Sequence, residues 1–238
     1  MINIAGLTVV YPDGTKAIDE LSFSVEKGER IAVIGENGAG KSTLLLSIVG
    51  VVRISHGAVT VDGISVTAKT LRDVRLKAGM VFQNPDDQLF MTKVYDDVAF
   101  APRNHGAAED EISIKVRHAL ESLGAAHLAD RMPHRLSCGE KRRVAIAGVL
   151  AMEPSVILLD EPGSFLDPRS RKQLINTLSA LPHTQIIATH DLDMAMDMCS
   201  RVIVLKNGKL AASGAPEEIL TDKRLLEECG LELPLSVR

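Results

Sequence analysis

Gly35-Glu36-Asn37-Gly38-Ala39-Gly40-Lys41-Ser42-Thr43 is a glycine-rich run of the form G-x-x-x-x-G-K-S. Arg30-Ile31-Ala32-Val33-Ile34, just before it, is mostly apolar and β-branched, as in a buried strand. Thr43 to Val49, just after it, contains no early helix breaker, so a helix is expected to begin there. Strand, glycine loop and helix are the context in which such a run binds phosphate. The alternative is a glycine-rich turn that happens to precede a helix.

The chemistry of this run suits a nucleoside triphosphate. Its glycines let the backbone turn tightly and approach an anion without a Cβ in the way. Amide groups then point inward, and the helix N-terminus adds partial positive charge. Lys41 is expected to reach the β- and γ-phosphates of ATP, and the Ser42 hydroxyl to bind Mg²⁺. We therefore predict an ATP site over residues 35–43.

The composition limits the class of protein. The chain has 238 residues, a hydrophobic content of 45% and a net charge of -4, which suits one large domain or a core with an inserted lobe. Basic residues form no stripe and aromatic residues make up only 3%, so nucleic acid is not expected as a partner. Cys138, Cys199 and Cys229 show neither zinc spacing nor a disulfide framework, and they fit a reducing cytosol.

Hydrophobic runs bear on the relation to a membrane. Met1-Ile2-Asn3 does not open a signal peptide. The longest apolar runs, Leu44 to Val52 and Val144 to Met152, are about half of the ~20 residues that span a bilayer. The chain is therefore expected to be soluble and to reach a membrane only through partners.

Apolar and alternating runs predict an α/β fold. Three early runs are expected to form an antiparallel β layer, namely Ile2 to Tyr11, Leu21 to Val25 and Ala58 to Val61. Further runs are expected as strands of a mostly parallel core sheet and a closing hairpin, namely Ala78 to Phe82, Ser155 to Asp160, Gln185 to Thr189, Val202 to Leu205 and Leu210 to Ser213. We predict one domain over 1–238, with a P-loop NTPase core at about 1–90 and 153–238. An α-helical subdomain is inserted at about 91–152.

The inserted segment carries helical patterns. One helical face is marked by Ile112, Val116, Ala119, Leu120 and Leu123, and another by Val144, Ala147, Gly148 and Ala151. Ser137 and Glu140 form a capping box at the start of the second helix, which explains both residues without any ligand. It does not explain Gly139, since glycine is unfavourable in a first turn. The free amides around Cys138 are a second possible anion site.

Two carboxylates end a buried run. Asp160 and Glu161 follow apolar residues, and burying them would be costly if nothing used them. A solvated acidic pair is the alternative. With the glycine-rich run, Asp160 is expected to support Mg²⁺ and Glu161 to polarise the attacking water. His190 ends a strand expected to lie parallel to theirs, where doubly wound sheets place chemistry, although a lone histidine is usually structural.

In this order, the motifs resemble the ATP-binding cassette (ABC) ATPases over nearly the whole chain. The resemblance implies that Tyr11 stacks on adenine, although it would otherwise be an ordinary strand-end aromatic. Gln83 would sense Mg²⁺ and the γ-phosphate, and His190 would be the switch histidine. Leu136-Ser137-Cys138-Gly139-Glu140 would be the signature, and Ser164 to Asp167 the loop linking two sites. In this family, two cassettes enclose two ATP molecules head to tail, so hydrolysis needs a second cassette chain.

The chain is most similar to the ATPases of energy-coupling-factor (ECF) transporters, particularly those of cobalt importers. The similar segments are Tyr11 to Ala17, Gln83 to Phe90 and Val144 to Leu150. The resemblance implies a peripheral protein on the cytoplasmic face of the cell membrane, with a transmembrane coupling subunit and a substrate-binding membrane subunit. Cobalt is the expected substrate, nickel comes next, and vitamin-importing relatives share these motifs. Homodimer and heterodimer both stay open.

The chain departs from the family pattern in its signature and in the linking loop. Cys138 replaces the usual glycine, Glu140 replaces the usual glutamine, and Gly163-Ser164-Phe165 is unusual. A transport ATPase is therefore weighed against a cassette ATPase serving DNA repair or translation, and against a regulatory module with no useful turnover. Glu161 and His190 argue against the last of these.

Overall fold

The computed structural model describes residues 1–237 and contains two β-sheets. The larger sheet has six strands in the order β10-β9-β3-β8-β7-β6. Its strands are β3 (Arg30–Ile34), β6 (Ala78–Val81), β7 (Val156–Asp160), β8 (Thr184–Ala188), β9 (Arg201–Lys206) and β10 (Lys209–Gly214). All neighbouring pairs are parallel except β9 and β10, which form a hairpin. The mostly parallel core sheet predicted from the sequence is confirmed.

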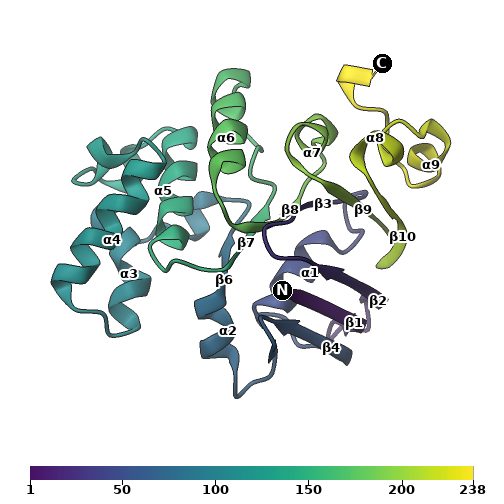
Figure 1. The fold of residues 1–238 in the computed structure, drawn as a ribbon, viewed down its shortest axis with the longest axis horizontal. Coiled ribbons are helices and arrows are strands. Elements are labelled where there is room, and N and C mark those ends of the chain that lie inside the picture. Colours follow the sequence, from purple (N-terminus) through teal and green to yellow (C-terminus); the bar gives the residue numbers. More distant parts are fainter. Residues whose placement is uncertain (238) are drawn as a thin grey trace.

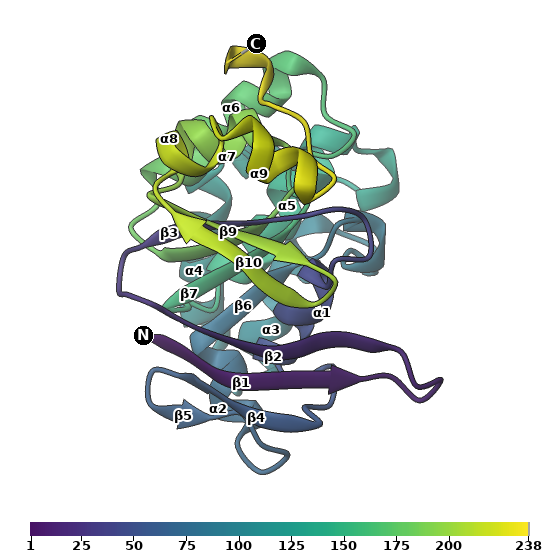
Figure 2. The same cartoon turned by 90° about the vertical axis from the view of Figure 1, so that its right-hand side faces the viewer.

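The smaller sheet is antiparallel and has the order β2-β1-β4-β5. Its strands are β1 (Ile2–Val10), β2 (Lys16–Val25), β4 (His56–Val61) and β5 (Ile64–Ser65). Figures 1 and 2 show this sheet on one side of the larger sheet, with α1 (Lys41–Ile48) between the two. The expected antiparallel layer is confirmed, although β2 begins five residues before the predicted Leu21.

Helices form the rest of the molecule. The helices that come after β7 in the chain lie on the opposite side of the larger sheet from α1, namely α6 (Pro168–Ala180), α7 (Leu192–Met198), α8 (Pro216–Ile219) and α9 (Lys223–Glu228). A helical group lies between β6 and β7 in the chain, namely α3 (Val94–Asn104), α4 (Glu109–Ser122) and α5 (Cys138–Leu150). Figure 1 shows this group at one end of the sheet, where an inserted helical segment was expected. A short helix, α2 (Leu71–Lys77), precedes β6.

Core strands bury both faces because their side chains alternate between two apolar clusters. In β3, Ile31 and Val33 pack with α1 and the antiparallel sheet. Ala32 and Ile34 pack in the cluster that contains the helical group. The second cluster continues into α3, α4 and α5, so the helical group shares a core with the sheet.

The helical faces predicted in the inserted segment largely agree with the structure. Ile112, Val116, Ala119 and Leu120 are the buried residues of α4. In α5 the buried set is wider than predicted, because the helix contacts both the sheet and the other two helices. Helix α6 begins at Pro168, because Asp167 caps it and proline suits a first turn. Within residues 1–237, none of the helices has the length and apolar character needed to cross a membrane.

Candidate active site

The glycine-rich run leaves β3 in the middle of the sheet and ends in α1. Gly40 precedes α1 with φ 105°, and a Cβ added there would lie 2.5 Å from the carbonyl oxygen of Ala17, so only glycine fits. Lys41 is buried, and its Nζ donates to the carbonyl oxygens of Gly35 at 2.7 Å and Glu36 at 3.0 Å. Burial lowers the pKa of Lys41, while the nearby Glu161 and Asp160 carboxylates act in the opposite direction. The loop is thus folded around its own lysine.

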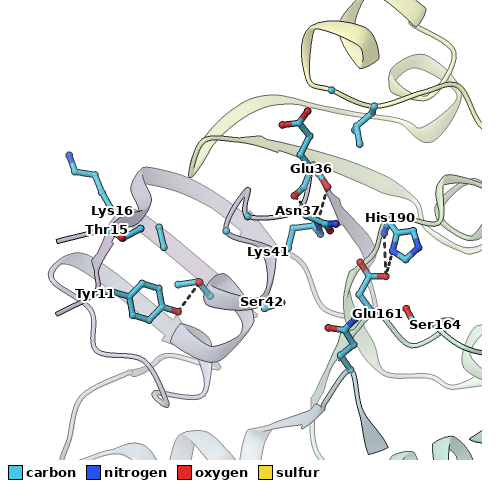
Figure 3. A pocket seen from close by; sticks show the side chains of 18 of the residues that line it. Tyr11, Thr15, Lys16, Glu36, Asn37, Lys41, Ser42, Glu161, Ser164 and His190 are labelled. Carbon is cyan, nitrogen blue, oxygen red and sulfur yellow. Dashed lines mark hydrogen bonds and ion pairs between the residues drawn. The ribbon is translucent and has the colours of Figure 1, made fainter. Parts of the chain in front are cut away.

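This loop borders a cavity of about 1010 Å³, large enough for a nucleotide. Four further sequence-predicted residues reach the same cavity from separate elements, namely Tyr11, Gln83, Glu161 and His190. Figure 3 shows the cavity with Tyr11 at one side, the loop in the middle and the Glu161–His190 pair at the other. The Tyr11 hydroxyl lies 3.0 Å from the Thr43 hydroxyl, which holds the aromatic ring beside α1. Ala39 is buried and does not line the cavity.

Asp160 lies beneath the loop at the end of β7. It is 6% exposed, and its Oδ1 has no hydrogen-bond partner in the described part of the chain. Burial raises the pKa of Asp160, which a hydrogen bond from the Ser42 side chain opposes. A carboxylate and a hydroxyl in contact are the hard oxygen donors that Mg²⁺ prefers, and the unpartnered Oδ1 leaves one free. These residues therefore fit a magnesium ion.

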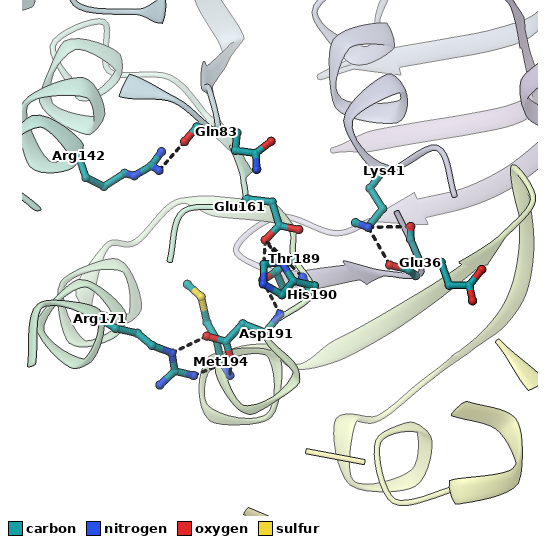
Figure 4. Close-up of polar contacts among 11 residues, drawn as sticks. Glu36, Lys41, Gln83, Arg142, Glu161, Arg171, Thr189, His190, Asp191 and Met194 are labelled. Carbon is teal, nitrogen blue, oxygen red and sulfur yellow. Dashed lines mark hydrogen bonds and ion pairs between the residues drawn. The ribbon is translucent and has the colours of Figure 1, made fainter. Parts of the chain in front are cut away.

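Glu161 turns out of the strand and meets His190. Its φ of 47° ends the regular strand geometry, while its backbone N–H still donates to the Ala188 carbonyl at 2.8 Å. Because β7 and β8 are parallel and adjacent, the residues following them meet at one edge of the sheet. The Nδ1 of His190 lies 2.7 Å from Glu161 Oε2, as Figure 4 shows. Glu161 is almost buried, while the His190 side chain is 64% exposed and open to a ligand.

Gln83 is held from behind by a residue that the sequence analysis did not single out. Arg142 of α5 is fully buried and donates to the carbonyl oxygens of Phe82 at 2.7 Å and Gln83 at 2.6 Å. Position 142 lies three, four and seven residues before Ala145, Ile146 and Val149, which are buried on α5. That spacing places an arginine on an apolar helix face, and it was the signal available in the sequence.

The remaining predicted residues do not reach this cavity. Ser137 caps α5, and its capping box with Glu140 is confirmed, with Ser137 N–H donating to Glu140 Oε2 at 2.8 Å. Cys138 is half-buried in the first turn, and Gly139 contacts the α6 side of the helix. Asp167 caps α6 by accepting from the backbone N–H groups of Arg169 and Ser170. Within one chain, the signature and Asp167 are apart from the phosphate loop.

Other residues line the cavity without having been predicted to do so. Ser164 and Phe165 come from the loop after Glu161, and Phe165 is 79% exposed with φ 64°. Gly230 and Leu231 come from the segment after α9. A Cβ at Gly230 would lie 1.5 Å from Glu36 Oε1, so the chain's C-terminal part packs directly on the phosphate loop. No local pattern links residues so far apart in sequence.

The chain is similar to several known ATP-binding proteins. A family model for ABC transporters matches residues 18–164. The energy-coupling factor transporter ATP-binding protein EcfA of Carboxydothermus hydrogenoformans is 45% identical over 240 residues, covering 100% of this chain and 88% of the relative.

Two solved structures resemble the whole chain. One is cbiO1 from Clostridium perfringens, part of the ABC transporter complex cbiONQ, with a TM-score of 0.85, 39% identity and coverage of 95% of this chain and 93% of that chain. The other is the ATP-binding cassette MJ0796, a dimer bound to ADP and Pi, with a TM-score of 0.82, 27% identity and coverage of 91% and 99%. Together with the cavity and its loop, these matches show that the chain belongs to the ABC transporter family, as one of its ATPase cassettes.

Proposed function

We propose that this chain is the ATP-hydrolysing subunit of an ECF-type importer and that it works as one of two cassettes beneath membrane subunits. The observation that carries the proposal is the convergence of Lys41, Ser42, Gln83, Glu161 and His190 on one cavity from four separate parts of the fold, namely the start of α1 and the segments after β6, β7 and β8. The similarity to EcfA and to cbiO1 supports the ECF type.

ATP binding falls to the residues at one end of the cavity. Tyr11 offers a ring face to adenine, and the amides of residues 35–43 surround the phosphates. Lys41 would exchange the carbonyl oxygens of Gly35 and Glu36 for the β- and γ-phosphates, an exchange that gains a charge-assisted partner.

The magnesium site falls to three residues. Asp160 and Ser42 would hold Mg²⁺, and Gln83, which lines the same cavity, would approach it. Bound there, the ion neutralises charge on the β- and γ-phosphate oxygens.

Hydrolysis falls to Glu161 and His190. A general base must lie within hydrogen-bond reach of the attacking water. Glu161 faces the cavity while His190 occupies its Oε2, so Oε1 is the oxygen available to orient a water molecule. His190, which is exposed on its other ring nitrogen, would contact the γ-phosphate and so couple the phosphate to the base.

A second cassette would complete the site. Ser137, Cys138, Gly139 and Glu140 lie outside their own chain's cavity, so they are available to the ATP of a partner. Asp167 would lie in the loop that joins the two sites. The dimeric ATP-binding cassette MJ0796 supports this arrangement. Both a homodimer and a heterodimer satisfy it.

The substrate and membrane partners follow from the ECF type. We propose uptake of a transition metal ion, with cobalt first and nickel next, because cbiO1 resembles the chain over most of its length. A vitamin such as biotin is the alternative cargo. The partners would be a transmembrane coupling subunit and a substrate-binding membrane subunit, which places the chain on the cytoplasmic face of the cell membrane.

The test combines one variant with one co-purification. Glu161→Gln keeps size and hydrogen bonding, so ATP should still bind, while turnover should fall by roughly 10²-fold or more because the base is lost. Normal turnover in the purified variant would end the assignment of Glu161. Capture of the wild-type chain from detergent-solubilised membranes should bring down the membrane subunits. Capture without any membrane protein would favour a cassette ATPase with no role in transport, and the cargo of the captured subunit identifies the substrate.

A further inference from the structure

Arg142 is a buried cation that the proposed chemistry does not use. It is 0% exposed, and no carboxylate of residues 1–237 lies within ion-pair distance of it. Its Nε has no hydrogen-bond partner among the same residues. Moving a guanidinium from water into the protein interior costs several kcal/mol unless hydrogen bonds or opposite charges offset that cost. An apolar side chain at this position of α5 would avoid that cost. The contacts of Arg142 therefore indicate what its charge and hydrogen bonds do.

The contacts of Arg142 join two parts of the proposed site. One guanidinium fork binds the carbonyl oxygens of two successive residues, Phe82 and Gln83, at 2.7 and 2.6 Å. Gln83 lines the nucleotide cavity. Cys138, one helical turn before Arg142, opens the helix that carries the signature segment. Figure 4 shows the guanidinium reaching from α5 to Gln83, close to the Glu161 side of the site.

Two outer contacts fix the same loop to the same helix. Gln88 accepts from the Phe82 backbone N–H at 3.2 Å and donates to the Ala145 carbonyl at 2.8 Å. Asp86 pairs with Lys141 at 2.6 Å on the surface. The loop of residues 82–88 is therefore bonded to α5 at three residues, namely Lys141, Arg142 and Ala145. Of these, Arg142 bonds directly to Gln83, which lines the cavity.

We propose that Arg142 is a positioning residue that fixes Gln83 at the nucleotide and makes the signature helix move with it. This proposal rests on the proposed ATPase function. Two parallel hydrogen bonds from one planar group fix orientation as well as distance. A shift of Gln83 toward bound ATP must carry α5 along, and with it the signature offered to the partner cassette. Occupation of one ATP site is thereby transmitted to the other site.

A double-mutant cycle tests whether Arg142 acts through Gln83. Arg142→Gln removes the charge and the fork, and kcat should fall by about 10- to 100-fold, since a displacement of about 1 Å in a positioned group has that effect. The KM for ATP should change by less than about threefold, because the phosphate loop is untouched. Gln83→Ala should lower kcat as well. The double variant should fall no further than the worse single variant, since two residues acting as one unit are not additive.

Arg30 offers a matched control. It also donates to two backbone carbonyls, those of Met198 at 2.9 Å and Ser179 at 3.0 Å, on the side of the sheet away from the cavity. Arg30→Gln should lower the melting temperature and leave kcat near the wild-type value. Its effect on kcat should multiply with that of Gln83→Ala, as expected for two residues that act independently. Arg142→Lys keeps the charge but reaches one carbonyl at a time, and it should recover part of the lost kcat.

Hydrogen exchange gives a second readout that needs no turnover. The amides of residues 82–88 should exchange faster in Arg142→Lys and Arg142→Gln than in the wild type. In Arg30→Gln their exchange rates should be the same as in the wild type. Multiplicative effects of Arg142→Gln and Gln83→Ala on kcat, or unchanged exchange at 82–88 in Arg142→Lys, would overturn the proposal. A wild-type chain that hydrolyses no ATP in its complex would instead refute the proposed function, and faster exchange at 82–88 would still show that Arg142 fixes the loop.

Discussion

Asp160→Asn is expected to change stability and hydrolysis in opposite directions. The carboxylate of Asp160 is 6% exposed, its Oδ1 is unpartnered within residues 1–237, and Glu161 is beside it. Burying a charged carboxylate costs free energy that burying a neutral amide of the same shape does not. The Ser42 hydrogen bond and the charges of Lys41 and Arg142 offset part of that cost. We expect the variant to gain about 1 kcal/mol in the free energy of unfolding, or about 2–4 °C in Tm for a chain of this size.

The gain should depend on pH with a definite sign. Burial raises the pKa of Asp160 above its ordinary value of 3.8. Between 3.8 and the raised value, the native state binds more protons at this site than the unfolded state does. The wild type therefore loses stability as pH rises through that window. The variant has no such group, so its advantage should be complete above the window and should disappear below it.

Thermal melts with a chelator and without nucleotide measure the stability, and a phosphate-release assay with Mg²⁺ measures hydrolysis. Turnover should fall by roughly 10²-fold or more, because a metal ligand is lost. Asp62→Asn makes the same chemical change on an exposed turn between β4 and β5, and it should stay within about 0.5 kcal/mol of the wild type. A variant that melts below the wild type at about pH 8, or that hydrolyses ATP normally, would refute the reasoning.

Two further predictions concern the surfaces offered to partners. Cys138 is half-buried, whereas burial raises the pKa of Cys199 to about 12 and also raises that of Cys229. An alkylating reagent should therefore label Cys138 first. In the Glu161→Gln variant, which is expected to bind ATP without hydrolysing it, ATP should protect Cys138 by closing the cassette dimer. Equal labelling of Cys138 with and without ATP, measured by peptide mass spectrometry, would contradict this prediction. Asp86→Lys places a second cation beside Lys141, which now pairs with Asp86 at 2.6 Å. We propose that Asp86, whose side chain is 60% exposed on the loop that carries Gln83, contacts the membrane coupling subunit. Co-purification with that subunit should then fall while the melting temperature hardly changes, since exposed pairs are worth about 0–1 kcal/mol. Undiminished co-purification would refute this docking role.

The parts of the fold that could be predicted were those with strong local signals. The run from Val156 to Asp160 is apolar throughout, and all of β7 is buried. The closing hairpin was also expected, and the Asn207-Gly208 turn that joins its strands has the positive φ that such a turn needs at both residues. Helix α2 was missed because only Val74 of its seven residues is buried, so it shows no periodicity. The first half of β2 was missed because Asp19 and Glu20 break its alternation, although Lys16 and Ile18 pair with β1 and keep this part of the strand in the sheet.

The site residues likewise fall into those with a local sequence signal and those without one. The phosphate loop, Asp160 with Glu161, and His190 each follow a strand, and the parallel sheet brings them together at one edge. Gly230 and Leu231 reach the cavity only because the end of the chain folds back over Glu36, and nothing local to either segment announces that contact. Arg142 was not singled out by the sequence analysis. The available signal was its helical spacing from buried residues of α5. Charged residues are almost never fully buried unless they are paired, so this spacing alone would not normally predict a buried arginine.

The loop after Glu161 shows why a single chain gives only half of the proposed site. Phe165 is 79% exposed at the rim of the cavity, with a φ of 64° that a bulky residue rarely adopts. Holding a non-glycine residue in that conformation costs on the order of 1 kcal/mol. Because Phe165 is mostly exposed to solvent, its burial within residues 1–237 offsets little of this cost. Covering a phenylalanine fully would return about 1.5–3 kcal/mol. Asp167, two residues on, is already satisfied as the cap of α6 and keeps the loop in place. A partner cassette that closes over the same cavity would cover this ring, and burial of the ring would then more than offset the backbone strain.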